Sequence, residues 1–172
     1  RDVERGRAAL GLTGQKVEKP AIETRPIGQD ALVLIVPPEH PWAGRRAVSL
    51  TALAHEPLVV REAGSGSRST LETALEQAGL SLAGLNVACE LGSNAAIKDA
   101  VRQRLGVAFL SRWAVAKELD AHELRTVRVH GLALSRRFYL VYRRHRPLSP
   151  AASAFVQFLD SHPLGPRRPD RS

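Results

Sequence analysis

The sequence predicts an α/β fold, in which a parallel sheet carries helices on both faces. Strand and helix patterns alternate through its central part, which is typical of such a sheet. Residues 31–36 are six consecutive apolar residues that stop at two prolines, as expected of a strand buried on both faces. The 172 residues, 44% of them hydrophobic and 24% charged, suffice for one domain or for two small lobes with a core.

The predicted strands are short apolar or alternating runs bounded by turn residues. They cover residues 8–12, 22–27, 31–36, 58–61, 85–91, 107–110, 124–129 and 138–143. Pro26 and Gly28 predict a break between the second and third of these strands. The proline-rich residues 37–46 predict a loop.

The predicted helices are recognised by apolar spacing and by their ends. They cover residues 50–55, 69–78, 95–104, 113–119 and 150–159. We expect Ser49 and Ser149 to cap the first and the last helix, and Pro150 suits a first helical position. Gly79 marks the end of the second helix.

Two loops lead from a predicted strand directly into a helix. In α/β folds ligands bind at such strand ends, where the free N–H groups of helix N-termini point. The first loop is Gly64-Ser65-Gly66-Ser67-Arg68, whose glycines permit close approach, whose hydroxyls donate, and whose arginine pairs with an anion. The second loop is Gly92-Ser93-Asn94. Together they predict a site for a carboxylate, sulfate or phosphate.

Ordinary helix capping is the alternative interpretation of the first loop. Ser69-Thr70-Leu71-Glu72 fits a capping box, in which Glu72 bonds back to the backbone of Ser69. With Ser69 as the cap, the protein itself would satisfy part of this helix end. The residues alone leave both interpretations open.

Catalysis has no support in the residue pattern. The first loop lacks the Gly-x-Ser-x-Gly of a nucleophile elbow and the Gly-Lys-Ser/Thr of a phosphate-binding P-loop. The six histidines show no metal-ligand spacing, Cys89 lies in an apolar strand, and nothing brings Glu62 and Glu90 together. We therefore expect no enzyme activity, no metal and no cofactor.

The net charge is +8, and residues 101–150 hold 11 basic and three acidic side chains. This balance is compatible with a nucleic acid, with an anionic small molecule, or with a solvated arginine-rich surface. One cysteine excludes an internal disulfide, and no apolar run approaches the roughly 18 residues of a membrane span. We expect a cytoplasmic protein without a membrane partner. Because a methionine before Arg1 is not normally removed, we also expect the chain to be a fragment.

Five segments resemble, in the same order, the C-terminal effector-binding (substrate-binding) domain of LysR-type transcriptional regulators. They are residues 30–41, 61–68, 90–98, 106–111 and 148–150. The resemblance extends from about Val3 to Leu159, and within the family it points to the branch that includes regulators of sulfur, selenium and carbon-fixation metabolism. Residues 120–123, Asp-Ala-His-Glu, depart from the pattern, because relatives usually turn there on a glycine.

The resemblance implies a type II periplasmic-binding-protein-like fold, with two Rossmann-like lobes joined by two crossover strands. Residues 31–130 would form the second lobe, and residues 1–30 and 131–162 a partial first lobe. The start of that lobe and the winged helix-turn-helix domain are expected upstream. Residues 163–172 are expected to form a disordered tail.

The family's effector-binding positions carry over to seven residues of this chain. They are Thr13, Ser65, Gly66, Ser67, Arg68, Ser93 and Asn94. The resemblance implies a small anionic effector that controls promoter DNA binding by the absent N-terminal domain, in a homodimer or homotetramer. A periplasmic-type solute-binding protein for a small anion is the alternative, because it shares the lobed fold.

Overall fold

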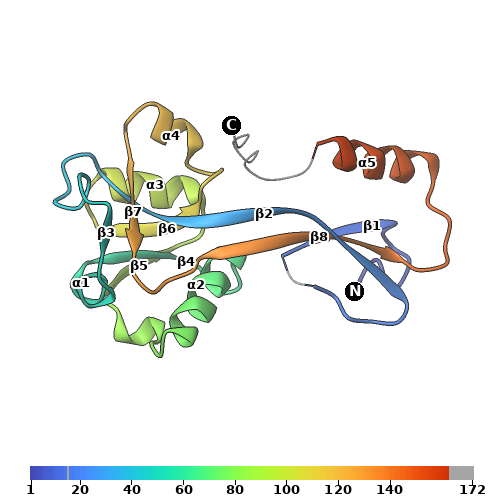
Figure 1. The fold of residues 1–172 in the computed structure, drawn as a ribbon, viewed down its shortest axis with the longest axis horizontal. Helices are drawn as coiled ribbons and strands as arrows, with labels where there is room; N and C mark the ends of the chain where they lie inside the picture. The colour runs from blue at the N-terminus through green and yellow to red at the C-terminus, as the bar shows by residue number, and fades with distance from the viewer. Residues whose placement is uncertain (15, 163–172) are drawn as a thin grey trace, which may run out of the picture. The chain divides into compact units, whose positions relative to one another are not determined.

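A computed structural model describes residues 1–14 and 16–162, which fall into two compact units (Figure 1). Unit 1 is formed by the described residues within Arg1–Asp30 and Arg136–Ser172, and unit 2 is formed by Ala31–Ser135. The predicted tail, residues 163–172, lies outside the described residues.

Unit 1 is built on an antiparallel sheet and one helix. Strand β1 (Leu10–Thr13) pairs with β8 (Ser135–Arg143), which also neighbours the first part of β2 (Ile22–Val36). Helix α5 (Pro150–Ser161) begins as predicted, because Ser149 Oγ accepts the Ala152 N–H at 3.3 Å and a proline opens the first turn. Its buried Leu159 packs in one cluster with Ile27 and Leu140.

The strand β2 is unbroken, so the predicted interruption at Pro26 and Gly28 is wrong. Among the described residues, the part of β2 in unit 1 has a hydrogen-bonded strand on one side only, since β6 and β7 pair with residues 32–36. A proline is tolerated on an unpaired strand edge, because the missing N–H leaves no ladder bond unmade. Pro26 is exposed there.

The sheet of unit 2 is mixed and not wholly parallel as predicted. Its order is β2, β6 (Val107–Ser111), β4 (Leu58–Arg61) and β5 (Val87–Leu91). Strand β4 runs parallel to both β5 and β6, whereas β2 is antiparallel to β6. Strand β7 (Arg125–Val129) pairs antiparallel with β2 and parallel with β3 (Ala47–Val48), a two-residue strand too short to be recognised from its pattern.

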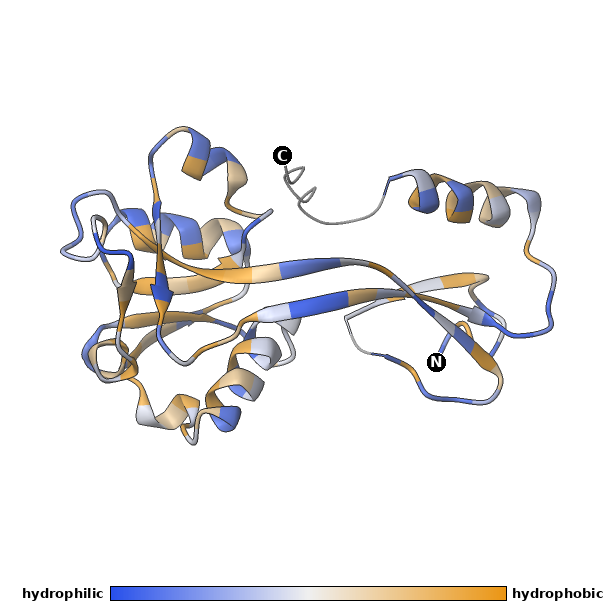
Figure 2. Cartoon of the chain, in the orientation of Figure 1, coloured by the Kyte–Doolittle hydropathy of each residue, from blue (hydrophilic) through white to orange (hydrophobic). Residues whose placement is uncertain are grey.

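Helices cover both faces of this sheet, as predicted. Helices α1 (Leu50–His55) and α2 (Gly66–Gln77) lie on one face, and α3 (Asn94–Arg102) and α4 (Ala116–Asp120) lie on the other (Figure 1). A 3₁₀ turn, η1 (Leu82–Gly84), follows α2. Figure 2 shows the apolar strands between the two helical layers.

Each face of the sheet has its own apolar core. One core contains Leu53 of α1 and Leu75 of α2, and the other contains Ile97 and Val101 of α3. Cys89 of β5 is partly buried and packs beside the second core. No helix in the described part of the chain is long and apolar enough to cross a membrane.

Helices α2 and α4 begin at other residues than the sequence predicts. Helix α2 begins at Gly66, three residues before the predicted start, and its N-cap is Ser65. Helix α4 is shorter than the predicted residues 113–119 and is shifted towards Asp120. The end of α2 is as predicted, because Gly79 has φ +75° and Leu80 N–H closes the last turn on Leu75 O at 2.9 Å.

Candidate functional site

The N-termini of α2 and α3 lie side by side at one edge of the unit 2 sheet. They follow β4 and β5, which are parallel neighbours with Arg61 opposite Leu91. Arg61 Nη1 donates to Asn94 Oδ1 at 2.5 Å, which links the last residue of β4 to the first residue of α3. The structure thus brings together the two loops that the sequence singled out.

The first turn of α2 presents unused hydrogen-bond donors. Within the described residues, the backbone N–H groups of Gly66, Ser67 and Arg68 have no acceptor, and the first helical bond runs from Ser69 N–H to Ser65 O at 3.0 Å. Four such orphan donors are normal for a helix, but they are usually satisfied by a cap, water or a ligand. This helix end is therefore suited to an anion.

The hydroxyl of Ser65 does not cap its own helix. The serines that cap α1, α3 and α5, namely Ser49, Ser93 and Ser149, each accept an N–H of the first turn, at 3.1, 3.1 and 3.3 Å. Ser65 occupies the same position at α2 but makes no side-chain cap bond. Its hydroxyl is therefore available to a bound molecule.

The capping box predicted as the alternative is absent. Ser69 lies inside the helix, and Glu72 accepts a hydrogen bond from Arg68 Nε at 2.8 Å instead of returning to the backbone of Ser69. The reason is that the helix starts earlier, at Gly66, which moves the capping position to Ser65. The N-terminus of α2 is consequently left open.

At α3, the protein satisfies part of the helix end. Ser93 Oγ accepts the Ala96 N–H at 3.1 Å, and Ile97 N–H bonds to Ser93 O. The N–H groups of Asn94 and Ala95 have no acceptor in the part of the chain that the structure describes. This end contributes backbone donors, while its serine hydroxyl already serves the helix.

Arginines and glutamates alternate around the two helix ends. Arg68 donates through Nε to Glu72 and through Nη1 to Glu90 and to Arg61 O. Arg61 forms a two-point contact with Glu62, at 2.7 and 2.8 Å, and its hydrogen bond holds the pKa of Glu62 below the usual value. Each arginine is thus balanced by a carboxylate, so an anion here would depend on N–H donors more than on surplus positive charge.

The structure also shows where the other residues discussed for this site lie. Glu62 is paired with Arg61, and Glu90 is paired with Arg68. Arg61 was not singled out from the sequence, since its contact with Asn94 depends on which strands are neighbours. Thr13, the last residue of β1, lies in unit 1 opposite Tyr139, whereas the other six predicted residues lie in unit 2.

Metal ligation has no support in the described residues, where no group of three His, Cys, Asp or Glu side chains is placed to hold an ion.

Comparison with known proteins shows to which family this chain is similar. The model of the LysR substrate binding domain matches residues 1–163. The RuBisCO operon transcriptional regulator of Allochromatium vinosum is 39% identical over 150 residues, which are 87% of this chain and 48% of that protein. The transcriptional activator CmpR of Synechocystis is 35% identical over 141 residues, 82% of this chain and 45% of the activator. This chain spans about half the length of the curated relatives it matches.

Solved structures agree with this match. The regulatory domain of Synechocystis CcmR, solved in complex with 2-PG, superposes with a TM-score of 0.81 at 26% identity, covering 96% of this chain and 79% of that one. The effector-binding domain of QuiR, solved with shikimate, has a TM-score of 0.74 at 20% identity, covers 95% of this chain and 77% of that one, and shows the shared fold. The fold is therefore type II periplasmic-binding-protein-like, as the resemblance implied. The chain belongs to the LysR substrate-binding domain family.

Proposed function

We propose that this chain is the effector-sensing domain of a LysR-type transcriptional regulator, and that a small anionic metabolite binds at the N-termini of α2 and α3. The unused hydroxyl of Ser65 is the observation that carries this site, because the other serine caps of α-helices serve their own helices. The N–H groups of Gly66, Ser67 and Asn94 add backbone donors. Arg68 takes part through Nη2, since Nε and Nη1 are bound to carboxylates and Arg61 O.

The effector we propose is a small phosphorylated acid of the 2-phosphoglycolate type. A phosphate group accepts several hydrogen bonds at once, which suits a helix end with three free N–H groups and a hydroxyl. A relative that is 26% identical was solved with 2-PG, and another that is 39% identical is a regulator of the RuBisCO operon. Thr13 of unit 1 is proposed as a further contact, by its correspondence to the family's effector position.

In the whole protein, we assign DNA binding to a winged helix-turn-helix domain upstream of this chain, within a cytoplasmic homodimer or homotetramer. The effector controls DNA binding only if it binds one arrangement of the protein more tightly than another, since equal affinity shifts no equilibrium. The RuBisCO operon regulator and CmpR are transcriptional regulators, which favours this function over a solute-binding protein. No enzymatic role is part of the proposal.

Matched serine variants test the site. We expect Ser65→Ala to weaken binding of 2-phosphoglycolate by about tenfold or more, because a hydrogen bond to a charged group contributes about 1.5–3 kcal/mol. We expect little change in stability, since Ser65 makes no cap bond. Isothermal titration calorimetry and urea denaturation measure the two effects.

Ser49→Ala is the control, because Ser49 caps α1 in the same unit. It is expected to lower the free energy of unfolding by about 1 kcal/mol and to leave the affinity unchanged. Equal binding by wild type and Ser65→Ala would contradict the assigned site. If neither 2-phosphoglycolate nor phosphate, sulfate or simple carboxylates bind the wild-type chain, the proposed anionic effector is wrong.

A further inference from the structure

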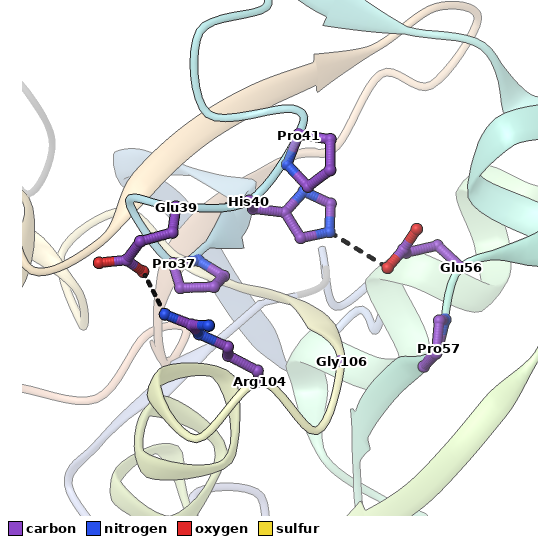
Figure 3. Close-up of a pocket in the computed structure, with 8 residues that line it drawn as sticks. All are labelled: Pro37, Glu39, His40, Pro41, Glu56, Pro57, Arg104 and Gly106. Atoms are coloured by element: carbon purple, nitrogen blue, oxygen red, sulfur yellow. Dashed lines mark hydrogen bonds and ion pairs between the residues drawn. The ribbon is translucent and has the colours of Figure 1, made fainter.

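A cavity of about 230 Å³ lies at the opposite edge of the unit 2 sheet (Figure 3). It is bounded by the residues just before β4 and β6 and by the segment that follows β2; its lining includes Pro37, His40, Glu56, Pro57, Arg104 and Gly106. Because β4 and β6 are parallel, this edge is the one remote from the N-termini of α2 and α3. The cavity is therefore separate from the site proposed above.

The backbone fixes one side of this cavity. Val107 N–H donates to Pro57 O at 2.8 Å, and a Cβ on Gly106 would lie 2.4 Å from the same oxygen. Only glycine allows this approach, and its φ of +157° also disfavours other residues. Together with the prolines of the lining, this contact gives the cavity a rigid and largely apolar wall.

The carboxylate of Glu56 faces the cavity, and its printed side-chain partner among the described residues is His40. His40 Nδ1 accepts the Trp42 N–H at 3.1 Å, so the ring proton resides on Nε2, which donates to Glu56 Oε1 at 3.1 Å. In the described residues, no lysine or arginine forms an ion pair with Glu56, whose side chain is 29% exposed.

Arg104 brings a positive charge to the other side of the cavity. It follows the end of α3 with φ +61°, in the left-handed region where helices usually end on glycine. An arginine there strains the backbone and directs a guanidinium to the cavity, as Figure 3 shows. Its contact with Glu39 is 3.5 Å long and both side chains are mostly exposed, so water competes with this pair.

We propose that this cavity binds a small zwitterion of the amino-acid type. Its ammonium group contacts Glu56, its carboxylate contacts Arg104, and its aliphatic part lies against the proline rings. Figure 3 shows the His40–Glu56 and Glu39–Arg104 pairs facing the cavity from different sides, which matches a ligand with one charge at each end. The proposal stands apart from the anion site and needs no part of it.

Trp42 provides a local reporter of binding. Its ring lies edge-on to His40, with the ring centroids 5.0 Å apart, and the chain has one other tryptophan, Trp113, whose side chain is exposed. In the Trp113→Phe chain, fluorescence therefore reports on this cavity. The probes are β-alanine, 4-aminobutyrate and 5-aminopentanoate, with butylamine and butyrate as ligands that each lack one charge.

We expect at least one of the three amino acids to change Trp42 fluorescence saturably, and butylamine and butyrate to bind at least about tenfold more weakly. Glu56→Gln keeps the acceptor for His40 but removes the charge, and it is expected to weaken amino-acid binding about tenfold or more. Arg104→Gly has the same expected effect, while its melting temperature stays equal or rises because glycine relieves the left-handed backbone.

The outcomes that overturn the proposal are distinct. Absence of a saturable response to all three amino acids excludes the zwitterion site. Binding of butylamine or butyrate as tight as that of the amino acids excludes the two-charge recognition. Unchanged affinity in a folded Glu56→Gln or Arg104→Gly chain excludes the assigned contacts. Ser65→Ala should leave this binding unchanged, and its loss there would place the ligand at the anion site instead.

Discussion

Three described residues other than glycine adopt a left-handed backbone conformation: Arg104, His122 and His145. Such a conformation costs an L-residue roughly 1 kcal/mol, because its Cβ crowds the carbonyl oxygen. His122 is instructive, because the segment 120–123 is where the family pattern places a turn on glycine. The turn is retained in this chain, with φ +61° at His122, although the glycine is not.

His122→Gly should therefore stabilise the chain. We expect the free energy of unfolding to rise by about 0.5–1 kcal/mol, because glycine adopts this conformation without a steric cost. Urea denaturation followed by circular dichroism measures the change. His122→Ala is the control, because it removes the contact of the imidazole with Arg125 but keeps the strained backbone. A glycine variant no more stable than the alanine variant would show that strain is not the cause.

Gly106 is predicted to tolerate no side chain. Gly106→Ala should lower the free energy of unfolding by about 2 kcal/mol or more, because the new Cβ would overlap the backbone oxygen of Pro57 and β6 would have to shift. Gly44→Ala is the matched control, since a Cβ at Gly44 meets nothing within 4 Å. Chemical denaturation compares the two. Equal free energies of unfolding for Gly106→Ala and Gly44→Ala would mean that the backbone at Gly106 can move away from Pro57 O at little cost.

At the scale of elements, an ion-pair cluster joins α3 to α4. Lys98 Nζ donates to Glu118 Oε1 at 2.6 Å and to Ala114 O at 3.3 Å, and Arg102 Nη2 lies 3.7 Å from the same carboxylate oxygen. The Glu118 side chain is 12% exposed, and its other oxygen is buried without a partner in the described structure. The hydrogen bond from Lys98 lowers the pKa of Glu118 from its usual value of 4.5.

This pKa shift predicts a loss of stability in acid. A carboxylate whose pKa is lower in the folded state stabilises the fold above the unfolded pKa, here 4.5, and loses that contribution as the pH falls through the folded value. Glu118→Gln should lower the free energy of unfolding by about 2 kcal/mol at neutral pH and should flatten its decline below pH 4.5. Urea denaturation across this pH range measures both.

Glu123→Gln is the control for this cluster, because Glu123 contacts Arg102 from an exposed position. We expect it to change the stability by less than about 0.5 kcal/mol at neutral pH. A Glu118→Gln chain with the wild-type acid dependence would show that other carboxylates determine the pH response.

Elements with local signals could be predicted from the sequence, and elements set by tertiary pairing could not. Ser49 and Pro150 mark helix ends through contacts within one turn, so both ends are where the sequence placed them. The unbroken β2 depends on which of its edges is paired, and β3 depends on β7, which lies about 80 residues further along the chain. The N-cap of α2 is also ambiguous from the sequence, since Ser65 and Ser69 are both residues that suit an N-cap position.

The candidate site shows the same division. The sequence predicts that the two glycine- and serine-rich loops lead into helix N-termini, because the residue types that favour a helix N-terminus are close together in the chain. The pairing of Arg61 with Asn94 and of Arg68 with Glu90 was not predicted, because it follows from the parallel alignment of β4 with β5. The sequence suggests that the Arg68 guanidinium is free to pair with an anion, whereas in the structure it is already hydrogen-bonded to Glu72 and Glu90.

At the scale of the whole molecule, the apolar core is distributed unequally. The two larger clusters, with 14 and nine buried members, lie wholly in unit 2. The described residues of unit 1 form two clusters of three buried residues each, around Val141 and around Leu140. Because apolar burial is the main favourable term in folding, unit 2 is expected to be the more stable unit.

Hydrogen exchange on the intact chain tests this difference. We expect the amides of β1 and β8 in unit 1 to exchange through local opening, at a lower free energy than those of β4 and β6, which open only with global unfolding. A fragment of residues 31–135 provides the second arm and is expected to unfold cooperatively, since both of its cores are complete within those residues. Equal protection in the two units, together with an unfolded fragment, would show that unit 2 depends on unit 1 for its stability.

In the same experiment, addition of 2-phosphoglycolate should slow exchange first at the N-termini of α2 and α3, because a ligand stabilises the state that binds it by RT ln(1 + [L]/Kd).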